Sequence, residues 1–150
     1  IDGLILPDMS IEESKDYLKS AKKNKLDTIF LVSPNTNNGR LRKIAKASTG
    51  FLYMVAVFGT TGVQTKIHKY TIDSIKNAKK IVGSKLPIGI GFGISTPSDV
   101  KKYVSVGVDA VIIGSANLKI IENTPPSKLQ KRITEYTKKL KRSTRIGKAT

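Results

Sequence analysis

The chain of 150 residues contains no cysteine, no tryptophan and a single histidine, His68. The absence of cysteine excludes disulfide scaffolds, cysteine-based zinc sites and thiol chemistry. Apolar runs are only a few residues long, so no membrane-spanning helix is expected. The opening residues also lack the basic start of a signal peptide. A reducing, cytoplasmic compartment fits these absences.

Acidic residues are scarce as well, with 11 Asp and Glu against 27 Lys and Arg, for a net charge of +16. This excess suggests anionic partners but says nothing about the fold. A nucleic-acid-binding module is therefore one alternative, and residues 143–150 form a basic tail. However, lysines occur in every predicted helix and no RNA-recognition, OB or helix-turn-helix pattern is present. We therefore expect no nucleic-acid partner.

Short apolar segments alternate with amphipathic segments along the chain. Strands are expected at residues 1–8, 28–32, 51–57, 87–91 and 110–113. Helices are expected at residues 10–24, 39–47, 71–82, 97–106, 115–122 and 126–142. Ser10 and Glu13 predict a capping box at the start of the first helix. Thr96 is the expected N-cap of residues 97–106, with Pro97 at the first helical position.

Five consecutive strand–helix units with almost wholly apolar strands predict a parallel α/β fold in a single domain. An open doubly wound sheet and a (β/α)8 barrel are both compatible with this order. A barrel needs eight units and about 250 residues, so five units are too few to close one. Because the first residues already read as a buried strand, we expect the chain to start inside a domain.

Glycine-rich turns follow the last two predicted strands. Gly91, Phe92 and Gly93 belong to a GFGIS turn, in which paired glycines expose backbone N–H groups that suit a phosphate. Gly114 and Ser115 open a short helix, whose first turn offers N–H donors and a hydroxyl. Each turn alone could be an ordinary connection or helix cap. Two on neighbouring strands favour phosphate binding.

Other candidate residues are less specific. The segment 58–69, with the letters GTTGVQT, could be a lid over a substrate. Asp8 could act as an acid or base, although helix capping or a lysine partner is the simpler interpretation. Tyr53 is expected to be a core ring and His68 a solvated side chain. No metal-ligand spacing or Ser/His/Asp set is present, so the residues by themselves indicate a phosphate-binding α/β fold.

Four segments occur in the order and at the spacing of a known family: DGLILPDMSIEES, FLYMVAVFGTTG, GFGIS and GSANLKIIE. Across essentially its whole length the chain resembles the tryptophan synthase α subunit. That family is a (β/α)8 TIM barrel that cleaves indole-3-glycerol phosphate to indole and glyceraldehyde 3-phosphate. The resemblance implies that this chain covers about strands four to eight of the barrel with their helices, the N-terminal units being absent. The other expected partner is a β subunit carrying pyridoxal phosphate, in an α2β2 heterotetramer, with no cofactor in this subunit.

The resemblance also implies roles for individual residues. Tyr53 and Thr61 would support catalysis, Thr61 by helping to position a carboxylate. Substrate-binding roles fall on Leu31, Tyr53, Gly62 and Phe92, and phosphate-binding roles on Gly93, Gly114 and Ser115. The two catalytic carboxylates of the family correspond to positions upstream of residue 1, and Asp8 matches neither. We therefore expect the isolated chain to be inactive.

Two further alternatives stay open. One is a different phosphate-binding TIM-barrel enzyme, although such relatives lack the DGLILPD opening and the GTTG loop. The other is a non-catalytic partner that completes a barrel with a separately made N-terminal half.

Overall fold

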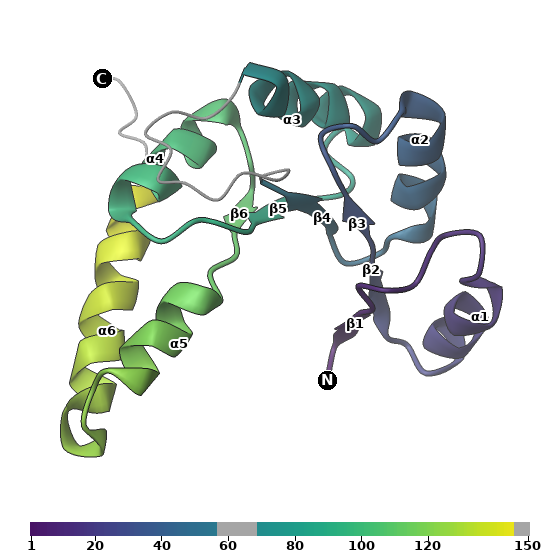
Figure 1. The fold of residues 1–150 in the computed structure, drawn as a ribbon. Coiled ribbons are helices and arrows are strands. Elements are labelled where there is room, and N and C mark those ends of the chain that lie inside the picture. The colour runs from purple at the N-terminus through teal and green to yellow at the C-terminus, as the bar shows by residue number, and fades with distance from the viewer. Residues whose placement is uncertain (57–68, 146–150) are drawn as a thin grey trace.

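The computed structural model describes residues 1–56 and 69–145. Its strands are β1 Gly3–Ile5, β2 Asp27–Ile29, β3 Leu31–Val32, β4 Leu52–Val55, β5 Ile88–Gly91 and β6 Ala110–Val111. Its helices are α1 Lys15–Lys23, α2 Asn38–Ala47, α3 Lys69–Val82, α4 Pro97–Val106, α5 Ser115–Glu122 and α6 Pro126–Ser143. The helices lie around the outer side of a curved row of strands, and α5 and α6 project together beyond β6 (Figure 1).

Among the described residues, every strand pair is parallel and joins neighbours in the sequence: β1 with β2, β3 with β4, β4 with β5, and β5 with β6. A doubly wound sheet reverses its strand order at a switch point, whereas a barrel adds each strand beside the preceding one. The sequential order therefore defines part of a barrel. It decides between the two architectures that the sequence left open.

The second predicted strand is one extended segment with two different neighbours. Asp27–Ile29 pairs with β1, and Leu31–Val32 pairs with β4 on the other side. Phe30 lies between the two ladders, and its carbonyl accepts a hydrogen bond from the Tyr53 N–H at 3.0 Å. The row of strands is thus continuous through Phe30, which is 4% exposed.

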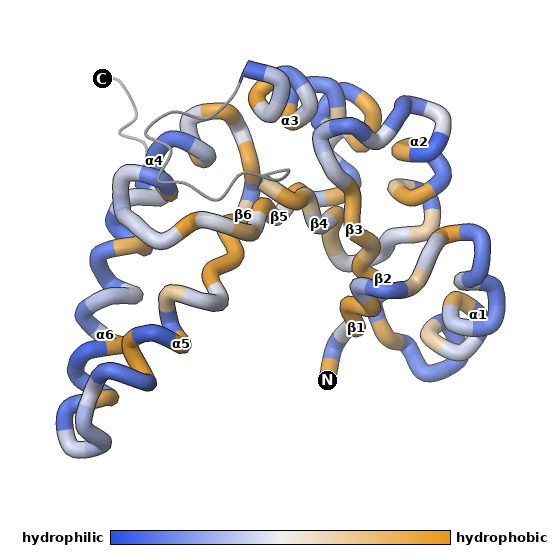
Figure 2. The backbone as a smooth tube through the Cα atoms, viewed as in Figure 1, coloured by the Kyte–Doolittle hydropathy of each residue, from blue (hydrophilic) through white to orange (hydrophobic). Residues whose placement is uncertain are grey.

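Alternation along the strands separates an outer, helix-covered face from an inner face. On β4, Leu52 and Met54 are buried, whereas Tyr53 and Val55 are only partly so. The apolar residues of Figure 2 accordingly gather on the strands and on the helix faces turned toward them. This period of two places the candidate residues of β4 on the inner face, opposite the helices.

The first helix begins later than the sequence predicted. The hydroxyl of Ser10 donates to the Glu13 carboxylate at 2.6 Å, so the two side chains bond each other rather than the backbone N–H groups of a helix. The Ser14 hydroxyl donates to the carbonyl of Ile11 at 2.8 Å, and α1 starts only at Lys15. The predicted capping box is therefore wrong as a helix start.

The capping box of α4 is confirmed. The Thr96 hydroxyl accepts from the Asp99 N–H at 3.1 Å, and the Asp99 carboxylate accepts from the Thr96 N–H at 3.0 Å. Pro97 follows as the first helical residue. In the part of the chain that the structure describes, no helix is long and apolar enough to cross a membrane.

Candidate functional site

An open pocket of about 520 Å³ lies at the carboxyl ends of the strands. Its apolar wall includes Leu31, Val55 and Phe92, which come from β3, β4 and the turn after β5. Met9 and Ile11, from the segment after β1, also line the pocket, and the further lining residues are Ser10, Phe30, Val32, Ser33, Thr36, Arg40 and Ile44. Two of the predicted substrate-binding residues, Leu31 and Phe92, therefore share one pocket.

Tyr53 lies beside this pocket, with its ring edge-on to that of Phe92 at a centroid separation of 6.0 Å. On its other side the ring of Phe51 is 6.3 Å away. A Cβ built on Gly91 would be only 2.8 Å from Cζ of Tyr53. The glycine at position 91 thus gives the tyrosine ring room to lie across β5. Burial raises the pKa of Tyr53 further above neutral pH, at which a tyrosine phenol is already protonated.

The turn after β5 has an unusual backbone. Phe92 and Gly93 both have positive φ angles, 73° and 72°. The left-handed conformation is costly for a residue such as Phe, and it is maintained only where the surroundings hold it. Here the side chain of Ile94 is anchored in the core at 5% exposure, while Phe92 itself is 56% exposed. The turn therefore presents an aromatic ring and the backbone of Gly93 at the surface.

The turn after β6 is open. Gly114 is the N-cap of α5, and apart from its chain neighbours and the α5 backbone no described atom lies within 4 Å of where its Cβ would be. Ser115 is exposed and makes no side-chain capping bond, so it is not the ordinary N-cap serine that the sequence allowed. Parallel pairing of β5 with β6 brings both glycine turns to the same end of the sheet. Gly93, Gly114 and Ser115 do not line the pocket itself.

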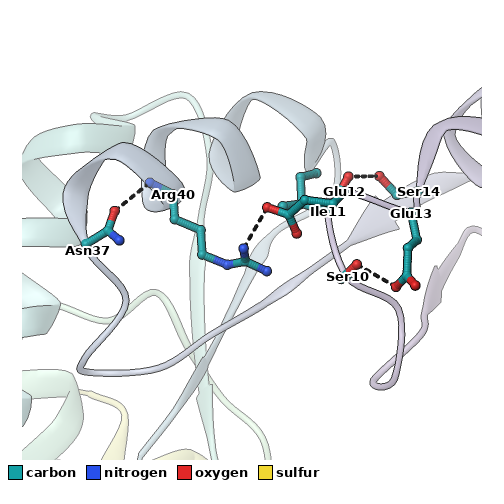
Figure 3. Close-up of polar contacts among 7 residues, drawn as sticks. All are labelled: Ser10, Ile11, Glu12, Glu13, Ser14, Asn37 and Arg40. Atoms are coloured by element: carbon teal, nitrogen blue, oxygen red, sulfur yellow. Dashed lines mark hydrogen bonds and ion pairs between the residues drawn. The ribbon is translucent and has the colours of Figure 1, made fainter.

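An ion pair joins the segment before α1 to the first turn of α2, beside the pocket. Arg40 at the start of α2 contacts Glu12 at 2.6 Å, and the side chain of Asn37 caps α2 by accepting from the Arg40 N–H at 2.9 Å (Figure 3). A backbone hydrogen bond together with the Arg40 guanidinium holds the pKa of Glu12 below its ordinary value. Both side chains are solvated, so the pair contributes little to the stability of the fold.

The remaining candidates are not part of this arrangement. Asp8 is exposed, and among the described residues its carboxylate neither caps a helix nor pairs with a lysine. Thr61, Gly62 and His68 lie outside the described residues, as does the candidate lid at 58–69 except for Lys69. Within residues 1–56 and 69–145, no group of three or more His, Asp or Glu side chains could hold a metal ion.

The sequence did not single out Met9, Val55, Arg40 or the packing role of Gly91. For Gly91 a signal was present, because alternate residues of the PIGIG segment are glycine and must share one face of the strand. For Arg40 there was none, since its contact with Glu12 spans 28 residues, from the segment before α1 to the start of α2.

The sequential order of parallel strands and the pocket at their carboxyl ends define part of a parallel (β/α) barrel with a candidate site at that end. Comparison with known proteins gives the family. The model of the family described as tryptophan synthase alpha chain matches residues 1–145. This chain belongs to the tryptophan synthase alpha chain family.

Individual relatives agree. The tryptophan synthase alpha chain of Thermococcus kodakarensis is 35% identical over 138 residues, covering 91% of this chain and 54% of the relative. That of Methanosarcina barkeri is 42% identical over 122 residues, covering 81% and 45%. The chain thus spans about half the length of the relatives it matches.

Solved structures show the same partial coverage. A chain of the tryptophan synthase α2β2 complex from Pyrococcus furiosus superposes with a TM-score of 0.82 at 31% identity, over 93% of this chain and 55% of that one. A chain of tryptophan synthase from M. tuberculosis gives a TM-score of 0.76 at 26% identity, over 96% and 51%. The fold is that of part of a TIM barrel, consistent with the strands four to eight expected from the resemblance.

Proposed function

We propose that this chain supplies the substrate-holding part of a site that cleaves indole-3-glycerol phosphate to indole and glyceraldehyde 3-phosphate. The observation that carries the proposal is the pocket at the strand ends, where Leu31, Val55 and Phe92 form an apolar wall beside Tyr53. A flat, apolar indole ring fits such a wall, because burial of its surface is favourable and ring edges contact its face.

The phosphate end of the substrate is assigned to the two glycine turns. The exposed backbone at Gly93 and the exposed hydroxyl of Ser115 lie at the same end of adjacent strands. The first turn of α5 adds the positive end of a helix dipole. These groups bind and orient; they do not transfer protons. Positioning and acid–base catalysis are separate contributions to rate.

Proton transfer is therefore assigned to groups outside these 150 residues. Cleavage requires a proton to reach indole C3, the ring N–H to be lost transiently and a hydroxyl of the glycerol chain to be deprotonated. By its resemblance to the family, the chain has neither of the two carboxylates that do this work. We expect the isolated chain to bind the substrate without releasing indole.

Calorimetric titration of the chain with indole-3-glycerol phosphate tests the proposal. Ser115→Ala should weaken binding about tenfold, because a hydrogen bond to a charged group is lost. Ser105→Ala is the matched control: Ser105 is also exposed, but its hydroxyl donates to the Lys102 carbonyl at the far end of α4. Absence of binding to the unmodified chain would contradict the proposal. Release of indole at an enzymatic rate would show that the proton-transfer groups are within the chain.

The same proposal includes a partner and a compartment. The relatives of known structure include the α2β2 complex of Pyrococcus furiosus, which supports a β subunit as partner. Pyridoxal phosphate would be held by that subunit, with no cofactor in this one. A cytoplasmic location accords with such an assembly. Co-purification with a β subunit, followed by gel filtration, tests the partnership.

A further inference from the structure

The strained turn after β5 is held from two sides. The peptide unit that links Ser95 to Thr96 carries the Ser95 carbonyl at one end and the Thr96 N–H at the other. The hydroxyl of Tyr136 donates to that carbonyl at 2.7 Å, and the Asp99 carboxylate accepts from that N–H at 3.0 Å. Because a trans peptide is planar, holding both ends fixes its orientation.

The two hydrogen bonds to this peptide unit come from different helices. Asp99 belongs to α4, the helix that directly follows the turn, and its bond is the ordinary capping interaction. Tyr136 belongs to α6 and reaches the turn across 41 residues of sequence. Its ring packs against the core, and Leu140, one helical turn further along the same face, is 8% exposed. The position of the Tyr136 hydroxyl is therefore set by how α6 packs against α4.

Tyr136 is also suited to its role as a donor. A tyrosine hydroxyl is protonated at neutral pH, and burial and the nearby Asp99 charge raise the pKa of Tyr136 further. The atom it holds lies three residues from Phe92, whose φ of 73° is costly and is maintained only by the surroundings of the turn, and two residues from Gly93. A phenylalanine would fill the same space without making this bond.

We propose that Tyr136 is a positioning residue for the phosphate-binding turn, acting through the Ser95 carbonyl. It touches no substrate; it transmits the packing of α6 to the orientation of the turn at residues 92–96. This inference deepens the proposed function and rests on its assignment of Gly93 to the phosphate end of the substrate. It adds a dependence of anion affinity on the last helix of the chain.

Nuclear magnetic resonance of the chain tests the proposal with two readouts. The first is hydrogen exchange of the Thr96 amide, which needs no ligand. The second is the Kd for inorganic phosphate, followed through the amides of the turn. Tyr136→Phe should speed Thr96 exchange and raise the phosphate Kd, each about three- to tenfold, because one hydrogen bond is lost. The secondary structure should be unchanged.

Tyr17→Phe is the matched control. The Tyr17 hydroxyl also donates to a backbone carbonyl, that of Leu4 at 3.0 Å, and its ring also packs against the core. This variant should leave both readouts at the unmodified values. Exchange and affinity unchanged in Tyr136→Phe, or changed equally in Tyr17→Phe, would overturn the proposal. If the unmodified chain does not bind phosphate, the assignment of the phosphate site fails, while the Thr96 exchange rates still decide whether Tyr136 holds the turn.

Discussion

Gly91→Ala is expected to destabilise the chain by forcing Tyr53 from its place. The added Cβ would lie 2.8 Å from Cζ and 3.1 Å from Cε1 of the ring, and closer still to the hydroxyl oxygen. The rings of Phe51 and Phe92, at centroid distances of 6.3 and 6.0 Å, limit the directions in which the Tyr53 ring can move, and any movement gives up its contact with one of them. Overpacking of this kind costs about 1–3 kcal/mol.

The destabilisation caused by Gly91→Ala should decrease when the side chain at position 53 is made smaller. In a double-mutant cycle, Gly91→Ala combined with Tyr53→Ala should be less destabilised than the sum of the two single variants, since the clash no longer exists. Tyr53→Phe should recover only part of the cost, because Cζ remains within 2.8 Å of the new Cβ. Urea unfolding followed by circular dichroism measures each free energy.

Gly114→Ala is the matched control for stability. Gly114 also lies at the carboxyl end of the sheet, after β6, but its φ of −108° suits any residue and the substitution there adds a Cβ with no described atom within 4 Å. Its free energy of unfolding should change by less than about 0.5 kcal/mol. Equal stability of Gly91→Ala and the unmodified chain, or strictly additive effects of the changes at 91 and 53, would refute the steric argument.

Two further predictions concern α4 and the approach to β6. Thr96→Ala should lower the free energy of unfolding by about 1 kcal/mol, because the capping bond from the Asp99 N–H is lost. Urea unfolding measures this change, and an unchanged urea midpoint would contradict the prediction. Burial alone would raise the pKa of Asp109, but the bonds from Lys79 and the Ile88 N–H lower it overall. Its ionised form therefore stabilises the fold above the ordinary carboxyl pKa, near 4, and this stabilisation is lost as the pH falls through the lowered value. Urea midpoints between pH 2 and 6 should fall less steeply on acidification in Asp109→Asn, and equal slopes would count against the role of Asp109.

Much of the architecture could be predicted from the sequence because helix and strand periodicities are local. The predicted strands overlap the observed ones, and five of the six helices begin within two residues of the prediction. The exception is α1. Ser10 and Glu13 have the spacing of a capping box, but their side chains satisfy each other, which spacing alone does not reveal.

The candidate site was harder to predict because it depends on contacts between distant segments. The pairing change at Phe30 requires knowledge of both neighbouring strands. The fit of Tyr53 over Gly91 requires the register of β4 on β5. The bond from Tyr136 to Ser95 crosses 41 residues, and the sequence shows only a tyrosine in a basic helix. The resemblance to the family indicated which turns to consider, but not these contacts.

The sequential strand order also bears on how the chain folds. Every strand pair joins segments that follow one another in the chain, so each new unit can dock on one already formed without closing a long loop. Topologies of this kind allow growth from one nucleus in either direction, as in repeat proteins. The contact of α4 with α6 and the Tyr136–Ser95 bond are the longer-range exceptions. The turn at residues 92–96, to which we assign the phosphate, therefore reaches its final hydrogen bonding only when α6 docks on α4, whichever unit forms first.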